Sequence, residues 1–331
     1  MTYNHTSISS LKEGDTIHAC YIIDGIHPCT TRQGTPCCFA SLKDVSGILT
    51  AVSWQPTGEL NADQNGTIVS INGTVTRYNG QLQISMESIE TVDRNEISEE
   101  VIRALVPSAP INVDEYKQAL INFVKSIRDF DIRTICEYLL LQRFWDLFVT
   151  YPAAKSCHHA FLHGLLMHTV DMAKMADSLC SMTPDKINRD LLIAGVLLHD
   201  IGKILEFTVS PVTGLVSKYS TSGNMIGHSV LGAQEIHTTG DTLQVNPDAI
   251  FLLEHMVLSH HGDPSCGAAA TPMTIEAELL HILDMLDSRR EIYAETLDTI
   301  PEWEMSPKVF ALGHSVYRHA LESMSIDKNG V

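Results

Sequence analysis

The chain has 331 residues, which is enough for two domains that each bury a core of their own. Its formal net charge at pH 7 is −18, which argues against a protein that coats nucleic acid nonspecifically, so any such contact would need a local basic or aromatic groove. Its eight cysteines include no Cys-x-x-Cys pair, so we expect no zinc ribbon and instead reduced, buried thiols.

The chain begins without a charged leader followed by an apolar core. Its apolar runs are all shorter than a membrane span requires. We therefore expect a soluble, cytoplasmic protein with no membrane partner.

Residues 1–94 alternate β-rich runs with turns and form the first expected domain. The runs cover residues 16–24, 37–42, 47–54, 67–78 and 81–86. Asn79-Gly80 between the last two runs is a strong signal for a two-residue hairpin. Several short strands at regular spacing with little helix predict a small all-β barrel or sandwich.

This arrangement resembles an OB-fold of the nucleic-acid-binding type. The resemblance rests on Leu42-Lys-Asp-Val-Ser-Gly47 before a strand that ends in Trp54, and on the run from Gly73 to Gln83. It implies a barrel face with aromatic and basic side chains for single-stranded nucleic acid, because every base offers a π-face for stacking. The candidate residues are Tyr21, Arg32, Phe39, Trp54, Arg77 and Tyr78. Phe39 and Trp54 could equally belong to the barrel core, whereas Tyr78 beside the hairpin tip should be exposed.

Residues 95–114 are expected to link the two domains. A short amphipathic helix over residues 96–105 is followed by Pro107 and Pro110, which disfavour helix at the preceding residues. Helical periodicity then returns over residues 116–128 and 132–149, at the start of a second, mostly helical domain over residues 115–331.

Residues 153–169 are rich in histidine. His163 and His168 are five positions apart, so on a helix they point away from a common face and not all of these imidazoles can serve one site. His158 and His159 are candidate contacts for a nucleic-acid substrate, or else ordinary polar positions near a helix start.

The most informative stretch is Leu191–Lys203, where an apolar run ends in His199-Asp200. Burying a histidine beside a carboxylate is costly unless they are paired or bound to a metal. An isolated His-Asp pair is more often a satisfied core histidine beside a helix-ending aspartate. Here, however, further imidazoles and carboxylates occur within other segments of helical apolar periodicity, so several helices could direct them to one point: His168, His228, His260, His261 and Asp284.

Imidazole and carboxylate together suit manganese, iron, nickel, zinc or magnesium better than a thiolate site would. Asp284 and Asp287 share a helix face, so either could be a ligand. Lys203 lies three positions after Asp200 and hence on the same helix face. It could hold a phosphate oxygen or stabilise charge in the transition state, or be a solvated surface lysine.

Two further elements complete the prediction. A polar, glycine-rich stretch over residues 207–226 favours a β-hairpin that could form a wall of the substrate cleft, with Lys218 and Tyr219 as its best contact residues. Residues 308–324 are expected to form a covering helix.

The order His, His-Asp, His, His-His, Asp resembles the HD phosphohydrolase superfamily, including the His199-Asp-Ile-Gly-Lys203 form of its central motif. The resemblance implies that one ion is held by His168, His199, Asp200 and Asp284 and favours Asp284 over Asp287. It implies that His228 and His260, with or without His261, hold a second ion or protonate the leaving group. The catalytic residues it implies are Asp200, Lys203, His228 and His260.

Nearly the whole chain resembles the YhaM family of 3′→5′ exoribonucleases. The motifs that match are Ser156-Cys-His-His-Ala-Phe-Leu162, Gly195–Ile204, Leu258-Ser-His-His-Gly262 and Pro272–Glu278, while His163 and Met167 depart from the family pattern. The resemblance implies a metal-dependent exonuclease on single-stranded RNA or DNA, with one or two ions. Manganese is the expected ion and Mg²⁺, Fe²⁺, Ni²⁺ or Co²⁺ the alternatives. It also implies a homo-oligomer.

Two rival functions belong to other classes. One is a phosphohydrolase of nucleotides or cyclic dinucleotides, in which the OB-fold serves regulation or assembly. The other is a single-strand binder with a degenerate HD domain, against which the complete set of candidate ligands argues.

Overall fold

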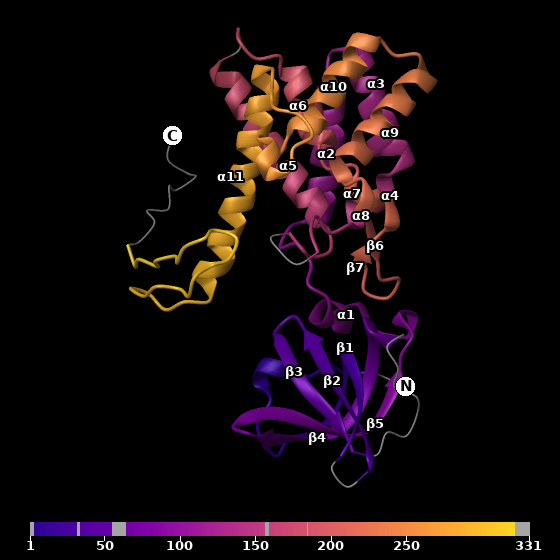
Figure 1. Cartoon of the computed structure of the whole chain (residues 1–331), viewed down its shortest axis with the longest axis vertical. Coiled ribbons are helices and arrows are strands. Elements are labelled where there is room, and N and C mark those ends of the chain that lie inside the picture. Colours follow the sequence, from indigo (N-terminus) through magenta and orange to yellow (C-terminus); the bar gives the residue numbers. More distant parts are fainter. Residues whose placement is uncertain (1–2, 32–33, 55–63, 156–158, 184, 322–331) are drawn as a thin grey trace.

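The computed structural model describes residues 3–31, 34–54, 64–155, 159–183 and 185–321. A β-barrel forms one end of the molecule and a larger body of helices the other, with α1 (Glu99–Leu105) between them (Figure 1). The predicted fold class, a small all-β barrel followed by a mostly helical region, is therefore confirmed. Among the described residues, no helix is both long and apolar enough to cross a bilayer.

Five strands close the barrel. They are β1 (Thr16–Thr30), β2 (Pro36–Asp44), β3 (Gly47–Ser53), β4 (Thr67–Tyr78) and β5 (Gln81–Thr91). Their order is β1-β2-β3-β5-β4, and β4 returns to pair with β1. Only the β3–β5 pair among them is parallel. This order is that of an OB-fold.

The long strand β1 closes the barrel because it pairs with two neighbours. Its first half pairs with β4 and its second half with β2, and the register shifts between Asp24 and His27. Gly25 in this shift has φ +59°, a backbone conformation that favours glycine and bends a bulged strand. The barrel core includes Tyr21, Ile23, Leu42, Ile71 and Ile84, all fully buried.

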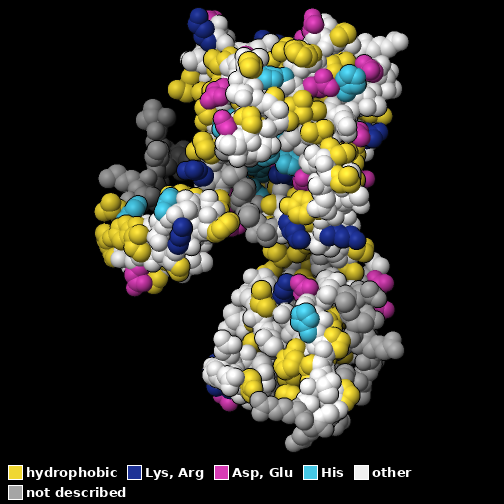
Figure 2. All heavy atoms as spheres, in the orientation of Figure 1, with side chains coloured by type: hydrophobic (Ala, Val, Ile, Leu, Met, Phe, Trp, Pro, Cys, Tyr) yellow, Lys and Arg dark blue, Asp and Glu magenta, His cyan; other side chains and the backbone are white. Residues whose placement is uncertain are grey.

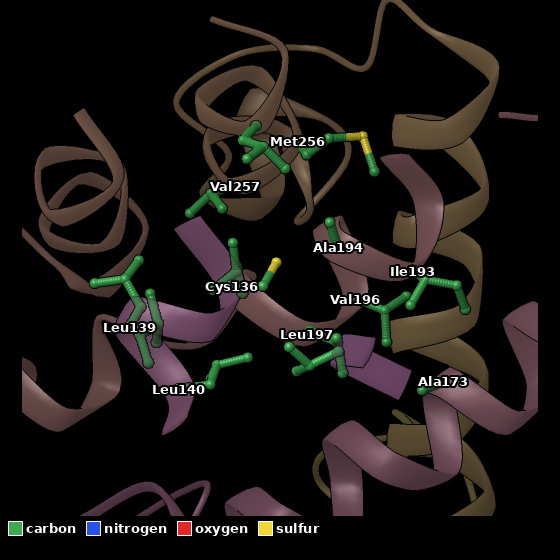
Figure 3. Close-up of a cluster of buried hydrophobic side chains, with 14 of the residues drawn as sticks. Cys136, Leu139, Leu140, Ala173, Ile193, Ala194, Val196, Leu197, Met256 and Val257 are labelled. Carbon is green, nitrogen blue, oxygen red and sulfur yellow. The ribbon is translucent and has the colours of Figure 1, made fainter. Parts of the chain in front are cut away.

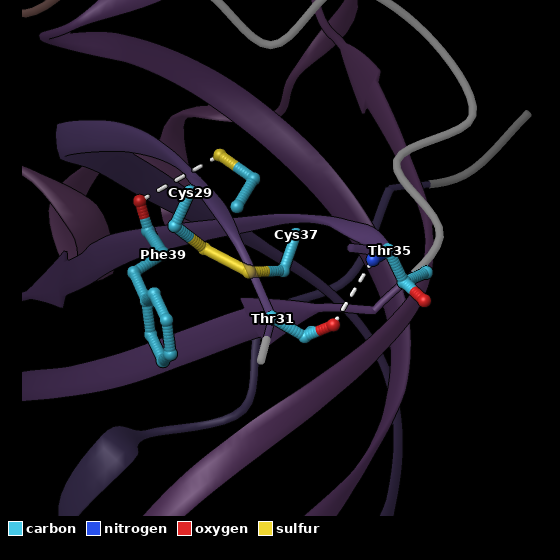
Figure 4. The surroundings of a disulfide bond; sticks show 6 residues. Cys29, Thr31, Thr35, Cys37 and Phe39 are labelled. Atoms are coloured by element: carbon cyan, nitrogen blue, oxygen red, sulfur yellow. Dashed lines mark hydrogen bonds between the residues drawn. A yellow bond between two sulfur atoms is a disulfide. The ribbon is translucent and has the colours of Figure 1, made fainter. Parts of the chain in front are cut away.

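A disulfide joins Cys29 of β1 to Cys37 of β2 (Figure 4). The two residues lie opposite each other in the register of the hairpin, with their Cα atoms 4.9 Å apart. The expectation that all thiols are reduced is therefore wrong for this pair. A count of cysteines does not reveal strand register, which is what brings these two together. The free cysteines that the structure describes are buried, as expected: Cys20, Cys38, Cys136 and Cys180.

The segment expected as a linker packs against both parts of the chain. Helix α1 follows a single 3-10 turn at Arg94–Glu96, and its Ile102 and Leu105 are buried. These side chains join Ile68 of the barrel in a hydrophobic cluster against which Leu162 and Leu215 of the helical body also pack. The cluster thus connects the barrel to the helices.

The helical body is built around α6 (Arg189–Leu198), whose residues from Leu191 onward are all buried. In Figure 3, Val196 and Leu197 of α6 lie beside Cys136, Leu139 and Leu140, with Met256 and Val257 nearby. The other helices are α2 (Val113–Ser126), α3 (Phe130–Cys136), α4 (Trp145–Thr150), α5 (Gly164–Met182), α7 (Lys203–Glu206), α8 (Thr221–Met225), α9 (His228–Leu243), α10 (Pro247–Ser259) and α11 (Ile275–Asp298).

Two predicted helices differ from the structure. The helix expected over residues 132–149 is divided, because a π-helix at Glu137–Arg143 separates α3 from α4. The covering helix expected over residues 308–324 is absent from the described part, which ends at residue 321. There the chain turns back at Gly313, with φ +75°, and forms isolated bridges such as Val309–His314. Phe310 in this arm is 99% exposed, so its apolar side chain does not pack against the protein as the expected covering helix would require.

The hairpin expected after the His-Asp motif is present as β6 (Phe207–Val209) and β7 (Val216–Tyr219). Short 3-10 turns at Ile8–Ser10 and Pro264–Cys266 complete the described elements.

Candidate metal centre

Helix ends supply most of the candidate ligands. Helix α6 ends at Leu198, so His199 and Asp200 leave its C-terminus, while His260 and His261 leave the C-terminus of α10. His228 is the first residue of α9, and His168 lies one turn into α5. Asp284 extends from the middle of α11. Histidine side chains accordingly gather in the hollow on the face of the helical body that Figure 2 shows.

Asp200 lies at the centre of the cluster, and its two carboxylate oxygens face different imidazoles. Its Oδ2 atom is 3.7 Å from Nε2 of His168 and 3.3 Å from Nε2 of His199. Its Oδ1 atom is 3.6 Å from Nε2 of His228 and 4.0 Å from Nε2 of His260. A carboxylate in this position can bridge two cations.

The cluster therefore has two sides, which we name by their residues. The first side comprises His168, His199 and Asp284, with 3.2 Å between the two Nε2 atoms and 3.4 Å from His168 Nε2 to Asp284 Oδ1. The second side comprises His228, His260 and His261, with 3.1 Å between Nε2 of His228 and Nε2 of His261. On each side the three donor atoms lie within 4.8 Å of one another.

The outer nitrogens of the imidazoles are anchored to the protein. Nδ1 of His168 lies 2.7 Å from Asp287 Oδ2, and Nδ1 of His228 lies 3.2 Å from Glu206 Oε1. Nδ1 of His199 and of His260 donate to the backbone carbonyls of the residues three positions earlier, at 2.8 and 2.6 Å. Such contacts fix the tautomer in which Nε2 carries the lone pair, as is usual around metal-bound histidines.

The electrostatics of the two sides are opposite. Burial disfavours a charged His168, but the hydrogen bonds that it donates to Asp284 and Asp287 outweigh this effect and raise the pKa of His168 to about 9. Burial and the neighbouring imidazoles lower the pKa values of His260 and His261. Burial would raise the pKa of Asp284, yet the hydrogen bond from His168 and the nearby imidazoles hold it far below its usual range.

Lys203 pairs with the central carboxylate. Its Nζ atom is 2.6 Å from Asp200 Oδ2. Burial opposes the charge of Lys203, but the neighbouring Asp200 raises the pKa of Lys203. Burial also opposes the charge of Asp200, but Lys203 and His199 hold the pKa of Asp200 well below its usual value. Lys203 is therefore a largely buried ion-pair partner and not the solvated lysine that was the alternative.

The backbones of the two sides are in contact. A Cβ atom added to Gly202 would lie 2.0 Å from the carbonyl oxygen of His228 and 2.7 Å from the nitrogen of Gly232. Only glycine therefore allows the turn after Asp200 to approach the start of α9 this closely.

The donor set fits a divalent ion. His260 Nε2 is buried and has no hydrogen-bond partner among the described residues, whereas the neighbours of the buried Asp200 Oδ2 are Lys203 Nζ and His199 Nε2. Buried polar atoms are normally satisfied, and an imidazole nitrogen left unpaired beside a carboxylate is what a bound cation would satisfy. Imidazole nitrogen with carboxylate oxygen suits first-row divalent metals and magnesium.

A cavity of about 400 Å³ opens onto this cluster. Its walls include Asp200, Lys203, His228, His261 and Asp284, together with Ala153, Ala154, Lys155, Glu206, Phe207, Tyr219 and Ser288. The cluster is thus accessible to a ligand although most of its side chains are buried.

Two residues near the cluster have roles that the sequence left open or did not suggest. Asp287 is fully buried and contacts His168, His159 and Arg290, with 2.9 Å to His159 Nε2 and 2.8 Å to Arg290 Nη2. It stands behind His168 and away from Asp200, so Asp284 is the carboxylate on the first side. Glu206 was missed; its position three residues after Lys203, on the same helix face, was the only signal.

Two of the expected substrate contacts are buried. Tyr21 is 0% exposed, and its hydroxyl donates to the carbonyl of Thr6 at 2.7 Å, so it belongs to the barrel core and cannot stack a base. The inward position of Tyr21 follows from strand alternation on β1, which the sequence pattern did not resolve. His159 is also 0% exposed and pairs with Asp287, so it cannot meet a substrate directly. Arg32 and His158 lie outside the described residues.

The remaining barrel candidates are exposed but form two groups. Phe39 and Trp54 are 38% and 46% exposed and pack edge to face, with ring centroids 6.3 Å apart. Tyr78 is 63% exposed at the β4–β5 turn, where Arg77 pairs with Glu13 at 3.0 Å. Val52 of β3, two residues before Trp54, pairs with Ser85 of β5, whereas Tyr78 pairs with Gln81 at the start of β5.

Residues 165–289 match the HD domain family, and the fold above places all seven candidate ligands within them. This part of the chain is an HD domain, which indicates a metal-dependent phosphohydrolase.

Solved structures similar to the chain include the second OB-fold domain of replication protein A from Methanococcus maripaludis. It is 22% identical over 27% of this chain and 94% of that chain, with a TM-score of 0.22. A replication protein A heterotrimer bound to single-stranded DNA is 19% identical over 28% of this chain and 69% of that chain, with a TM-score of 0.22. RecG bound to a three-way DNA junction is 13% identical over 72% of this chain but only 32% of that chain, with a TM-score of 0.23.

Proposed function

We propose that the protein is a metal-dependent phosphodiesterase that removes nucleotides from the 3′ end of single-stranded RNA, and that it also accepts DNA. The observation that carries this proposal is the placement of Asp200 between two sets of imidazoles at the floor of an accessible cavity. Two cations can hydrolyse a phosphoester together when they are held close to each other, and a carboxylate in this position could contact both.

The proposed ligands follow the two sides of the cluster. His168, His199 and Asp284 would hold one ion, His228, His260 and His261 a second, and Asp200 would contact both. Manganese is the proposed metal because of the resemblance to the YhaM family, and a set that mixes imidazole with carboxylate is compatible with it. When bound, the ions supply an activated water and neutralise phosphate oxygens.

The protein's own groups would prepare this site. Asp287 and Glu206 orient His168 and His228, so that their Nε2 atoms face the centre. Lys203 offsets the negative charge of Asp200 and contributes a cation to the cavity wall. A positive group there would favour an approaching phosphate and the charge that develops during hydrolysis.

A polymeric substrate is supported by the barrel. Phe39 and Trp54 of the barrel present an exposed aromatic pair. Base stacking on such a pair does not depend on sequence. We propose the division of the chain into a nucleic-acid-binding barrel (residues 1–94), a connecting segment (95–114) and the hydrolase domain (115–331).

Hydrolysis of nucleotides or cyclic dinucleotides remains the second candidate. Its support is the net charge of −18, which disfavours long polyanions, and a cavity of about 400 Å³, which is of the size that small ligands occupy.

We also propose that the protein forms a homo-oligomer in the cytoplasm. On α11, the exposed apolar residues Ile275, Ile282, Leu286 and Tyr293 are spaced seven, four and seven positions apart and so form one stripe along the helix. Light scattering of the wild type and of Leu286→Glu tests this, since a dimer through the stripe should become a monomer in the variant.

Degradation of end-labelled RNA tests the proposed function. Single-stranded RNA labelled at the 5′ end should give a ladder that shortens with time when Mn²⁺ is present, and EDTA should stop it. RNA labelled at the 3′ end should release labelled mononucleotide at once. Intact RNA with every divalent metal, together with hydrolysis of a cyclic dinucleotide, would favour the second candidate.

A further inference from the structure

The cavity at the metal centre has a neighbour, and one side chain lines both. A second cavity of about 490 Å³ lies between the barrel and the helical body. Its walls include Ile22, Lys43 and Gly66 from the barrel and Val216 and Ser217 from β7. Lys155 lines this cavity and also the cavity at the metal centre.

The hairpin β6–β7 separates the two cavities. Val216 and Ser217 line the cavity beside the barrel, whereas Tyr219, at the end of the same strand, lines the one at the metal centre. The ring of Tyr219 packs edge to face on Phe207 at 5.3 Å and is 39% exposed. The Nζ atom of Lys155 lies 5.7 Å from the centroid of that ring. An aromatic ring and a cation therefore stand together where the cavities meet.

The second cavity is a built feature, because one hydrogen bond joins its two walls and two more join the segments around it. Ser210 Oγ donates to the carbonyl of Gly66 at 3.3 Å, and Arg94 Nη1 donates to the carbonyl of Val212 at 2.8 Å. The backbone of Val45 also donates to Ala104 at 3.1 Å. The first of these bonds joins the barrel to the hairpin, the second joins the segment after β5 to the hairpin, and the third joins the barrel to α1.

Lys155 differs in its charge partners from the other lysines that line the two cavities. Lys43 pairs with Asp24, and Lys203 pairs with Asp200. Asp44 has no exposed side-chain surface and accepts hydrogen bonds from the backbone of Ile8 and Gly47. Among the described residues that line either cavity, Lys155 is the lysine that forms no ion pair with a carboxylate, and its side chain is exposed.

We propose that Lys155 and Tyr219 form a second nucleotide subsite, which binds the phosphate and the base next to the nucleotide at the metal centre. The strand continues from there into the cavity between the barrel and the helical body. This inference rests on the proposed function, because it concerns the same substrate. An aromatic face and an unpaired cation are the groups that hold a single strand without reading its sequence.

Binding tests the subsite without catalysis. A fluorescein-labelled ten-nucleotide RNA is titrated with the full chain in EDTA, and fluorescence anisotropy gives the Kd. Lys155→Ala and Tyr219→Ala should each weaken RNA binding about tenfold. Tyr219→Phe keeps the aromatic ring and should bind the RNA as tightly as the wild type does. Lys125→Ala is the matched control, because Lys125 is exposed near the end of α2 and lines neither cavity.

The salt dependence separates a phosphate contact from loss of packing. Lys155→Ala should reduce the slope of log Kd against log salt concentration by about 1, which corresponds to the loss of one phosphate contact. Tyr219→Ala should leave this slope unchanged. A structural role for Lys155, such as covering the Tyr219 ring, would move the affinity without moving the slope. That result would overturn the subsite.

Cleavage distinguishes the subsite from the function on which it rests. For Lys155→Ala, the ratio of kcat/KM on the RNA to kcat/KM on bis(4-nitrophenyl) phosphate should fall about tenfold. An equal loss on both substrates, or none, would overturn the subsite while leaving the nuclease intact. RNA that binds through Lys155 but is never cleaved would overturn the nuclease and leave the subsite standing. Absence of RNA binding by the wild type would overturn the subsite alone, since hydrolysis of the small diester still tests the metal centre.

Discussion

The two sides of the metal centre use different donors and carry different charges. The first side has a carboxylate, Asp284, and a histidine, His168, that two carboxylates keep protonated up to a pH of about 9. On the second side all three donors are imidazoles, and the pKa values of His260 and His261 are lowered. A metal must therefore displace a proton from His168 on the first side, whereas the lowered pKa values of His260 and His261 leave these two imidazoles on the second side neutral near pH 7. Similar residues thus form two inequivalent sites because of what surrounds them.

The largest effect should come from the group that both sides share. Asp200→Asn removes the bridging charge and should reduce phosphodiester hydrolysis by about 10³-fold or more, since a cation's charge stabilisation amounts to several kcal/mol. Steady-state kinetics on bis(4-nitrophenyl) phosphate measures this loss. Asp241→Asn is the control, because Asp241 is exposed near the end of α9. Activity within tenfold of the wild type would remove Asp200 from the centre.

Next in size is a matched pair of variants, one behind each side. Asp287→Asn weakens the support of His168, and Glu206→Gln that of His228. Each should lower the affinity of its own side for Mn²⁺ by about 10- to 100-fold. Isothermal titration calorimetry resolves two binding steps, and thermal unfolding checks that both variants are folded. If both variants weaken the same step, the division into two sides is wrong.

The pH dependence of binding should sharpen the contrast further. Because the pKa of His168 in the metal-free protein is raised to about 9, the protonated form dominates below that pH and competes with the metal. Affinity at the first side should therefore fall by about tenfold for each pH unit below 9, and binding at pH 7 should release about one proton. Calorimetry in buffers of different ionisation enthalpy counts the proton. A first side that binds equally well at pH 6 and pH 9 would contradict the raised pKa.

The smallest effect concerns a hydroxyl next to His168. Thr169 Oγ1 is buried without a hydrogen-bond partner among the described residues. Thr169→Val keeps the shape and removes this group, so the free energy of unfolding should stay the same or rise by about 1 kcal/mol. Urea denaturation measures the change, and Mn²⁺ affinity should not move. Weaker metal binding in this variant would show that the first side depends on more than its carboxylates.

The barrel could be predicted from the sequence because its signals are local. Turn residues such as Asn79-Gly80 and the strand alternation between them lie within a few positions of each other. Register is less local, which is why the Cys29–Cys37 disulfide and the inward position of Tyr21 were missed. A strand pattern does not by itself state which face is inside.

The metal centre was predictable only in part, for a related reason. His199-Asp200 is conspicuous because the two residues end a buried helix, and the other candidate ligands were found through a family resemblance. The supporting carboxylates carry no such mark. Asp287 approaches His168 across 119 positions of chain, and Glu206 approaches His228 across 22, so only the packing of α5, α7, α9 and α11 reveals them.

Gly202 fixes the distance between the two sides through the main chain. Its backbone touches that of His228 and Gly232, so no side chain stands between the turn after Asp200 and the start of α9. Side-chain substitution can therefore reshape the cavity walls, at Tyr219 or Ser288 for example, without changing how far apart the two sides stand. Substitutions in the cavity walls can therefore change which molecules the protein accepts, while the main-chain contact at Gly202 keeps the spacing of the metal centre constant. Redesign of its specificity should begin at those walls.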